Sequence, residues 1–391
     1  MSNLLEKKQN WAWWFLLPLY PYKRRRTLIR ELIPDQLWSF EQLQGLFYVA
    51  VPIRMTVIKI DKGLMIYNPI APTIQVIEIL YQLEEKYGAI LTIVLPTTSG
   101  LEHKLPLPAL ARSFPMAEIW VSPGQWSFPL QIPLGWLGIP PKRTRTLLEQ
   151  KTPHGDQLSW YSLGPLDLGV GRFQEIACFH KSSSALLLTD SLISFGIEPP
   201  EIFNDDPTPL LFHAREYGDE LLIDSLENRR KGWARMVLFA SYLRPERLKV
   251  RPVPQALFHS FRAGLRHPHT HFGLYPLAWY PDWYKSFELL MTDDSKGSRL
   301  QIAPVLERLV FPRSKAILIE WMKQLEKIEG LSVLVPAHYN APIPCCTQDI
   351  IELREGTASR NWASNQENWF FLASLDRRLL NLGFLPSQSI I

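Results

Sequence analysis

The chain has 391 residues, of which 46% are hydrophobic, so it can bury a sizeable core as one elaborated domain or two. Its 42 basic and 38 acidic residues leave a net charge of only +4. Because the sequence has no long basic stripe interleaved with aromatic residues, nucleic acid is excluded as the expected partner. Cys178, Cys345 and Cys346 are too few and wrongly spaced for a disulfide framework, which suits a reducing compartment, and without a CxxC pair they cannot form a zinc ribbon.

The first distinctive segment is an aromatic run at residues 11–22, WAWWFLLPLYPY, followed by the basic run KRRR at 23–26. Two prolines interrupt the run, and it is too short to span a bilayer and lacks a signal-peptide cleavage site. Two interpretations stay open. The arm packs its rings onto the domain, or its rings and cations lie at a lipid headgroup surface and give peripheral membrane contact through residues 11–26.

The residues after this arm predict alternating strands and helices. Strand-like runs at 55–60 and 64–67 predict a β-hairpin, and Thr73 and Gly88 are the expected N-cap and stop of the helix that follows. The next expected elements are a strand at 90–95, a short helix at 108–114 and a strand at 117–121. This order indicates an α/β layering.

The second half of the chain differs in composition. A hairpin is expected at 175–179 and 185–188, after which residues 198–282 are rich in proline and mixed charge, with one predicted helix at 227–243. The remaining expected elements are helices at 302–310 and 314–327, a strand at 331–335 and an amphipathic helix at 365–382.

These patterns divide the chain into five expected segments. They are an N-terminal aromatic and basic arm at 1–45, the first half of the main domain at 46–197, an insertion that would act as a lid at 198–300, the second half of the domain at 301–345, and a C-terminal helical extension at 346–391.

Three apolar runs share one design, in which a metal-binding type of side chain follows the run within a few residues. The runs at 90–95, 185–188 and 331–335 lead to Glu102 and His103, to Asp190 and to His338, respectively. Short apolar runs are typical of buried strands, and α/β sheets collect ligands at the carboxyl ends of their strands. We therefore expect these four side chains to converge on one rim.

Several sequence runs give the chain its resemblance to a known family. They include LYPY at 19–22, VPIRMTV at 51–57, LPTTSGLEHK at 95–104, QWSFP at 125–129, TDS at 189–191 and PAH at 336–338. With these runs the chain resembles the DUF4336 family of cyanobacteria and chloroplasts, which is placed within the metallo-β-lactamase-fold superfamily, and the resemblance extends over nearly the whole chain. It implies an αββα sandwich of metallo-β-lactamase type, with metals at one edge of the two sheets and a large insertion before the last metal-site strand.

The superfamily's metal motif is only partly present. Its His-x-His-x-Asp-His run corresponds to residues 98–103, so both leading histidines are missing and Glu102 stands where aspartate is usual. Asp190 matches the bridging aspartate and His338 matches the closing histidine, whereas the stretch 163–168 lacks the histidine expected before the second hairpin. The resemblance therefore implies at most one metal site, made of Glu102, His103, Asp190 and His338.

Two functions follow and stay open. Two imidazoles and two carboxylates can bind one zinc, iron or manganese ion, which would support metal-assisted hydrolysis of an ester or phosphoester with Glu102 as fourth ligand or catalytic base. Alternatively, the four side chains form a metal-free polar network in a non-catalytic protein that binds a small molecule or a protein partner. Lys104 adds a cation beside the cluster, which would oppose a metal or pair with a carboxylate.

Two other groups of residues have simpler readings. His267, His269 and His271 alternate in a manner that would turn all three imidazoles to one side, where they could bind zinc or copper in place of the missing histidine pair. The neighbouring prolines and arginines favour an exposed loop instead. The basic residues at 229–235 are expected to form salt bridges with nearby acids. The lack of a transit-like extension favours the cytoplasm of a bacterium, with membrane association as the alternative that the arm leaves open.

Overall fold

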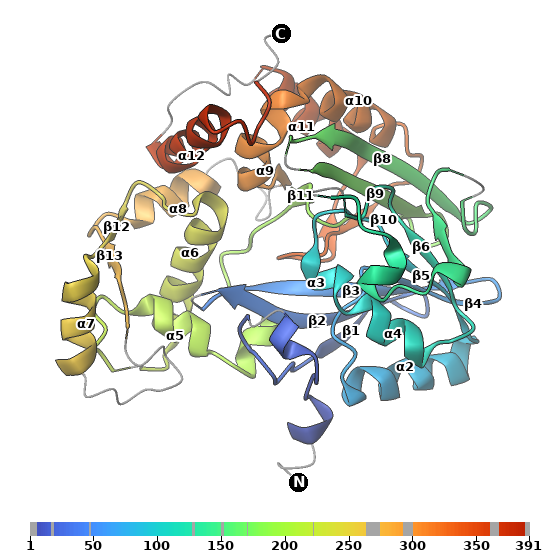
Figure 1. Cartoon of the computed structure of the whole chain (residues 1–391), viewed down its shortest axis with the longest axis horizontal. Helices are drawn as coiled ribbons and strands as arrows, with labels where there is room; N and C mark the ends of the chain where they lie inside the picture. The colour runs from blue at the N-terminus through green and yellow to red at the C-terminus, as the bar shows by residue number, and fades with distance from the viewer. Residues whose placement is uncertain are drawn as a thin grey trace.

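The structure, a computed structural model, describes residues 6–16, 19–46, 48–126, 130–149, 152–169, 171–221, 223–262, 274–291, 300–359 and 367–387. Two sheets form the centre of the molecule (Figure 1). The first has seven strands in chain order: β1 (Leu28–Ile33), β2 (Leu37–Leu46), β3 (Val49–Ile60), β4 (Gly63–Tyr67), β5 (Ile90–Leu95), β6 (Glu118–Val121) and β7 (Thr144–Thr146). Strands β1 to β4 pair antiparallel and β4 to β7 pair parallel.

The second sheet has five strands in the order β16-β15-β10-β9-β8. They are β8 (Leu158–Asp167), β9 (Arg172–His180), β10 (Ala185–Leu187), β15 (Val333–Val335) and β16 (Ile343–Pro344). Only β10 and β15 pair parallel, so both strands reach the same edge of this sheet at their carboxyl ends.

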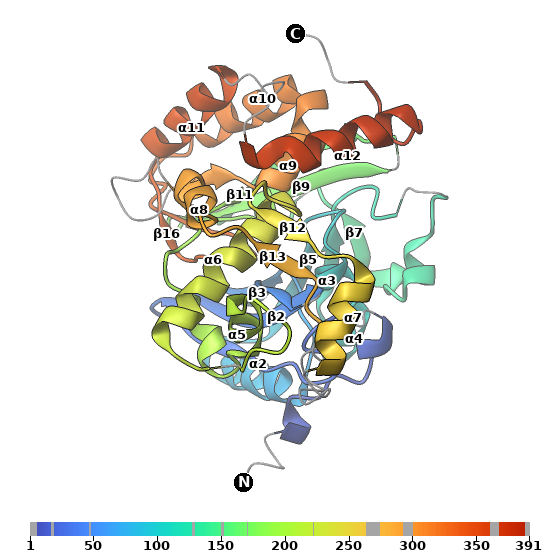
Figure 2. The same ribbon diagram turned by 90° about the vertical axis from the view of Figure 1, so that its left-hand side faces the viewer.

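Helices cover the outer face of each sheet. The first sheet carries α2 (Ile74–Tyr87) and α4 (Leu107–Ser113), and the second carries α10 (Lys315–Leu325) and α11 (Thr347–Ser359), at opposite ends of both ribbon views (Figures 1 and 2). Three apolar layers pack between the two sheets and the helices on their outer faces. Val76 and Leu110 pack beneath the first sheet, Tyr67 and Leu187 meet between the sheets, and Trp321 packs on the second. The αββα sandwich expected from the sequence is therefore confirmed.

Local sequence explains most of the predicted elements. The hydroxyl of Thr73 accepts the backbone N–H of Val76 and caps α2, which ends at Gly88 with a φ of 98°. The hairpins of β3 with β4 and of β9 with β10 form where the apolar runs predicted them. Residues 28–45, which the sequence assigned to the N-terminal arm, form β1 and nearly all of β2 of the seven-stranded sheet. The overlooked strand signal was the alternation of apolar and polar side chains at residues 38–41 in β2.

The insertion contributes a second, mostly helical layer beside the sandwich. It contains η4 (Glu201–Asn204), α5 (Thr208–Ala214), α6 (Leu226–Tyr242), β12 (Leu248–Val250), α7 (Val253–Arg262), β13 (Leu277–Trp279) and α8 (Tyr284–Met291). A small ladder of β11 (Leu192–Ile193) with β14 (Gln301–Ile302) joins its two ends. Beyond it lie α9 (Pro304–Leu309) and, near the C-terminus, α12 (Phe370–Asn381).

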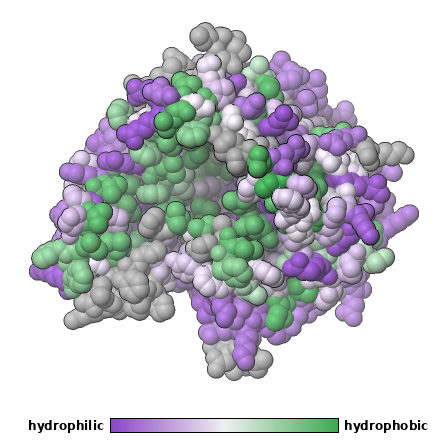
Figure 3. Space-filling model, viewed as in Figure 1, coloured by the Kyte–Doolittle hydropathy of each residue, from purple (hydrophilic) through white to green (hydrophobic). Residues whose placement is uncertain are grey.

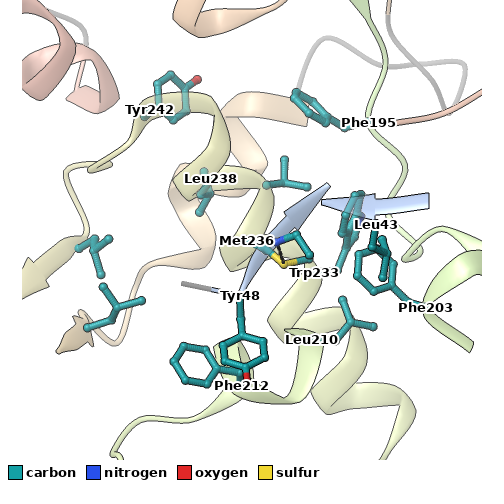
Figure 4. Packing of buried hydrophobic residues seen from close by; sticks show 14 of the residues in the cluster. Leu43, Tyr48, Phe195, Phe203, Leu210, Phe212, Trp233, Met236, Leu238 and Tyr242 are labelled. Carbon is teal, nitrogen blue, oxygen red and sulfur yellow. Dashed lines mark hydrogen bonds between the residues drawn. The ribbon is translucent and has the colours of Figure 1, made fainter. Parts of the chain in front are cut away.

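Helix α6 fixes the insertion to the first sheet (Figure 4). Trp233 and Met236 of α6 are buried, and the backbone N–H of Ala50 contacts the Met236 sulfur at 3.3 Å. Tyr48, between β2 and β3, stacks on Phe212 of α5 with ring centroids 4.8 Å apart. This contact holds the insertion against the sandwich. On the face seen in Figure 3 the surface is hollowed near its centre, where hydrophobic side chains gather.

The N-terminal arm is partly packed and partly exposed. Trp11 and Tyr20 are buried, and the backbone N–H of Trp11 donates to the Lys23 carbonyl at 2.9 Å, so the arm folds back on itself. Trp13 and Phe15 are about half exposed, at 46% and 56%. The described residues include no helix of sufficient length and apolarity to cross a membrane.

Candidate metal centre

The four predicted residues reach one rim from two different sheets. Glu102 and His103 lie in the short helix α3 (Leu101–Lys104), which follows β5 of the seven-stranded sheet. Asp190 and His338 follow the parallel neighbours β10 and β15 of the five-stranded sheet, so they exit at the same edge. The expected convergence is observed, since the rings of His103 and His338 have their centroids 6.2 Å apart.

Both histidines are oriented by proline carbonyls. The Nδ1–H of His103 donates to the Pro69 carbonyl at 2.9 Å, and the Nδ1–H of His338 donates to the Pro52 carbonyl at 3.0 Å. Because a carbonyl only accepts, each bond fixes the tautomer and turns Nε2 toward the rim. Metal-binding histidines are commonly held in this way by a carbonyl on their second nitrogen.

His103 has an unsatisfied nitrogen at the rim. The side chain is fully buried, and its Nε2 has no hydrogen-bond partner among the described residues. Burial lowers the pKa of His103, which favours the neutral imidazole with a free lone pair on Nε2. A buried polar atom without a partner is costly, and a free lone pair close to a carboxylate and a second imidazole is an arrangement that a cation would satisfy.

His338 contacts both carboxylates. Its Nε2 lies 3.0 Å from Asp190 Oδ1 and 3.6 Å from Glu102 Oε1. Burial works to lower the pKa of His338, but its bonds to Asp190 and Glu102 outweigh burial and raise the pKa to about 10. Burial would raise the pKa of Glu102, but the His338 bond and nearby His103 hold it at about 2.

The donor set fits one divalent ion. Ligand atoms of Glu102, His103 and His338 all lie within 4.8 Å of one another, and Asp190 joins them through His338. Two ligands of a tetrahedral ion are about 3.4 Å apart when the bonds are about 2.1 Å, a separation close to the 3.0 and 3.6 Å around His338 Nε2. Nitrogen and oxygen donors of this mixture suit zinc, iron or manganese.

Glu175, on β9, supports Asp190 and was missed in the sequence. Its buried carboxylate accepts the backbone N–H groups of Thr189, Asp190 and Ser191 at 2.7 to 2.9 Å. Burial, and then the charge of Asp190, raise the pKa of Glu175 to about 7, although the three backbone donors act in the opposite direction. From the other side, the Ser99 hydroxyl donates to Asp190 Oδ2 at 2.8 Å. The sequence signal was a lone acid in the mostly apolar run FQEIACF at 173–179.

Arg54, on β3, supports His338 in the same manner. Its guanidinium is fully buried and donates to the carbonyls of Pro336 and Tyr339, which flank His338. Glu41 on β2 pairs with Arg54 Nε at 3.0 Å and so compensates its charge. An arginine inside a buried strand therefore holds the loop that carries the closing histidine.

Lys104 takes neither role expected of it. Its Nζ donates to the carbonyls of Thr98, at 2.8 Å, and Gln125, so it ties the loop before α3 to the segment after β6. Burial lowers the pKa of Lys104 to about 8. The Lys104 ammonium group is thus bonded to backbone carbonyls and forms no ion pair with a carboxylate among the described residues, although the charge of Glu102 acts to raise its pKa.

The remaining sequence candidates lie elsewhere. The alternating histidines at 267–271 fall outside the described residues. The basic residues of α6 form ion pairs, as expected: Arg229 pairs with Asp224 at 2.6 Å, and Arg235 pairs with Glu216 at 2.6 Å.

Solved structures similar to this chain are metallo-β-lactamase-fold proteins at low identity. A metallo-β-lactamase from Pontibacter korlensis is 10% identical, with a TM-score of 0.35 over 84% of this chain and 99% of that one. The DIM-1 metallo-β-lactamase is 9% identical, with a TM-score of 0.37 over 85% of this chain and 99% of that one. A mutant flavo di-iron protein from Thermotoga maritima is 10% identical, with a TM-score of 0.42 over 86% of this chain and 62% of that one.

Sequence comparison gives a more direct assignment. No curated protein matches the chain. One family model, described as a domain of unknown function (DUF4336), matches residues 34–354, which include both sheets, the insertion and all four rim residues. Because this model covers most of the chain, the chain belongs to the DUF4336 family.

Proposed function

We propose that the protein binds one divalent metal ion through His103, His338 and Glu102, with Asp190 beside it, and hydrolyses an ester or phosphoester there. The observation that carries this proposal is the buried Nε2 of His103, which has no hydrogen-bond partner among the described residues. A ligand atom of this residue lies within 4.8 Å of ligand atoms of Glu102 and His338. The tautomer of His103 is already fixed for ligation by the Pro69 carbonyl.

Each residue has a defined part in this chemistry. A divalent ion held at the rim would lower the pKa of a water and polarise a substrate oxygen. His103 would supply a neutral nitrogen, and His338, whose pKa is raised to about 10 by the two carboxylates, would give up its Nε2 proton when the ion binds. Asp190 is held by Glu175 and Ser99 so that its carboxylate faces the rim. Glu102, partly exposed on α3, would act as ligand or accept the proton of the attacking water.

Elemental analysis tests metal binding directly. The full-length protein would be loaded with zinc, dialysed and compared with Glu102→Gln, His103→Ala, Asp190→Asn and His338→Ala. The proposal expects about one ion per chain in the wild type, its loss in the two histidine variants, and a fall in melting temperature on chelation. His154→Ala is the matched control, because this half-buried histidine bonds Thr92 away from the rim, so the variant should retain the ion.

Hydrolysis needs its own measurement. Turnover of p-nitrophenyl acetate or bis-p-nitrophenyl phosphate should require the loaded ion and should disappear in Asp190→Asn and His338→Ala. A loaded protein that turns over neither probe would retain the metal site but lose the proposed reaction.

A second function is favoured by the ion pair between His338 and Asp190, at 3.0 Å. A protonated His338 can hold both carboxylates without an ion, which would make the rim a polar site of a non-catalytic binding protein. In that case the zinc-loaded wild type holds no ion after dialysis, and Asp190→Asn lowers stability without any change in metal content.

A further inference from the structure

A groove with a volume of about 790 Å³ lies between the insertion and the C-terminal helix α12. One wall comes from the segment between α6 and β12 and from β12 itself, and the other comes from the first turns of α12. Helix α12 and strand β12 lie in the same part of the molecule in both ribbon views (Figures 1 and 2). Sites for small organic molecules have volumes of about 300–1,000 Å³. No residue of this groove belongs to the rim described above.

The groove is lined by basic side chains that have no acidic partner among the described residues. Arg244, Lys249 and Arg378 line it together with a single carboxylate, that of Glu246. Among the described residues none of the three cations forms an ion pair, although Arg244 Nε donates to a backbone carbonyl at 3.4 Å. The wall therefore has a surplus of positive charge.

Neighbouring basic side chains behave differently. Arg247 pairs with Asp282 at 3.2 Å, and Arg313 pairs with Asp376 at 2.7 Å, both within the same part of the fold. These acids near the groove are thus bound to other basic residues, and among the described residues no acid pairs with the three cations of the wall. A ligand with negative charge would supply the missing partner.

Aromatic rings form the rest of the wall. Tyr280 is 48% exposed and Phe370 is 65% exposed, and Leu375 lies beside them. Flat or apolar groups would gain from covering these rings, because each large ring left in water forgoes a substantial burial free energy. The groove thus combines a charged end with an apolar surface.

Helix α12 presents these side chains because its other face is anchored. Leu372 and Ala373 are buried, and Asp376 forms the buried ion pair with Arg313. At 100° per residue these three positions occupy one side of the helix, while Phe370, Leu375 and Arg378 fall on the opposite side. The groove wall is therefore a fixed surface of the folded protein.

We propose that this groove binds a small organic anion, a phosphate or carboxylate joined to a flat or apolar body. The anionic group contacts Arg244, Lys249 and Arg378, and the body covers Tyr280 and Phe370. This site is independent of the metal centre, so it holds whether or not the rim binds an ion.

Isothermal titration calorimetry of the full-length protein tests the proposal with four probes: adenosine monophosphate, adenosine, inorganic phosphate and decanoate. At least one of the two organic anions should bind more tightly than both adenosine and inorganic phosphate, and its affinity should fall as salt rises. Tighter binding of adenosine monophosphate assigns an aromatic body, and tighter binding of decanoate assigns an acyl body.

Variants then locate the site. Arg378→Ala and Lys249→Ala should each weaken the organic anion by about tenfold, as expected for the loss of one charge-assisted contact, and Tyr280→Ala should weaken it by a similar factor. Arg377→Ala is the matched control, because it removes the same charge from the neighbouring position of α12 outside the groove. Circular dichroism confirms folding. The three groove variants lie in three separate places, α12, β12 and the residue after β13, so if one variant misfolds the other two still test the site.

Two results would overturn the proposal. One is that no organic anion binds more tightly than neutral adenosine. The other is that the groove variants bind the anion as tightly as Arg377→Ala does.

Discussion

The buried carboxylate of Glu175 lies beneath the loop of Asp190 and accepts that residue's backbone N–H at 2.9 Å. The two acids come from neighbouring strands of the five-stranded sheet, and only Asp190 faces the rim. The Glu175 carboxylate therefore fixes the backbone that positions the Asp190 side chain.

Glu175→Gln should weaken metal binding by about 10- to 100-fold, the range found when a supporting residue behind a metal ligand is removed. The amide keeps the shape of the carboxylate, but its N–H donor would lie against backbone N–H groups. In the wild type these groups share the Glu175 carboxylate as their acceptor. Competition with a chromogenic chelator measures the affinity. Glu118→Gln, at an exposed pair with Arg145, is the control and should bind as the wild type does.

Arg54→Met should lower the free energy of unfolding by about 3–5 kcal/mol, because it breaks a buried ion pair and leaves Glu41 with only the partly exposed Arg30. It also removes the donors that hold the carbonyls on both sides of His338. Urea denaturation measures the loss. Arg145→Met, at an exposed pair, should cost no more than about 1 kcal/mol, and equal effects of the two variants would contradict the role given to Arg54.

Gly232→Ala should destabilise the protein although alanine favours helix by about 1 kcal/mol. A Cβ at Gly232 in α6 would lie 1.8 Å from the Leu210 carbonyl oxygen of α5, so the two helices would have to separate. Gly356→Ala in α11 meets nothing within 4 Å and should be neutral or stabilising. Thermal melting of both variants would show opposite signs, and a stable Gly232→Ala protein would mean that α5 and α6 pack less closely.

His180 should make stability depend on pH. Burial lowers its pKa from 6.5 to about 4, and both ring nitrogens contact serine hydroxyls, of Ser183 at 2.7 Å and of Ser182 at 2.9 Å. The unfolded chain binds a proton at this histidine before the folded chain does, so stability falls as pH drops from about 6.5 to 4, by up to about 3 kcal/mol. Urea titrations at pH 7, 5.5 and 4.5 measure the free energy of unfolding, which should change less with pH in His180→Asn than in the wild type.

The sequence predicted the rim because its signals are local. The apolar runs before Glu102, Asp190 and His338 form strands, and the parallel pairing of β10 with β15 brings the last two residues to one edge. The contributions of Glu175 and Arg54 depend on contacts across the sheets, with partners 15 and more than 280 residues away. The sequence spacing of residues does not predict such contacts. The only indication of each is a charged residue inside an apolar strand.

The direction of Lys104 could not be predicted for a similar reason. Its neighbours in sequence are the rim ligands, but the short helix α3 turns its side chain toward the carbonyls of Thr98 and Gln125. A four-residue helix has too few positions for periodicity to indicate which face is buried.

The two proline carbonyls that orient His103 and His338 lie next to β4 and within β3. The histidines themselves follow strands of different sheets, so an ion between them would cross-link the two halves of the sandwich much as a disulfide joins two chains. Stripping such an ion would release the layers from each other, and hydrogen exchange would then speed up at the rim edge before the opposite edge of the sheets.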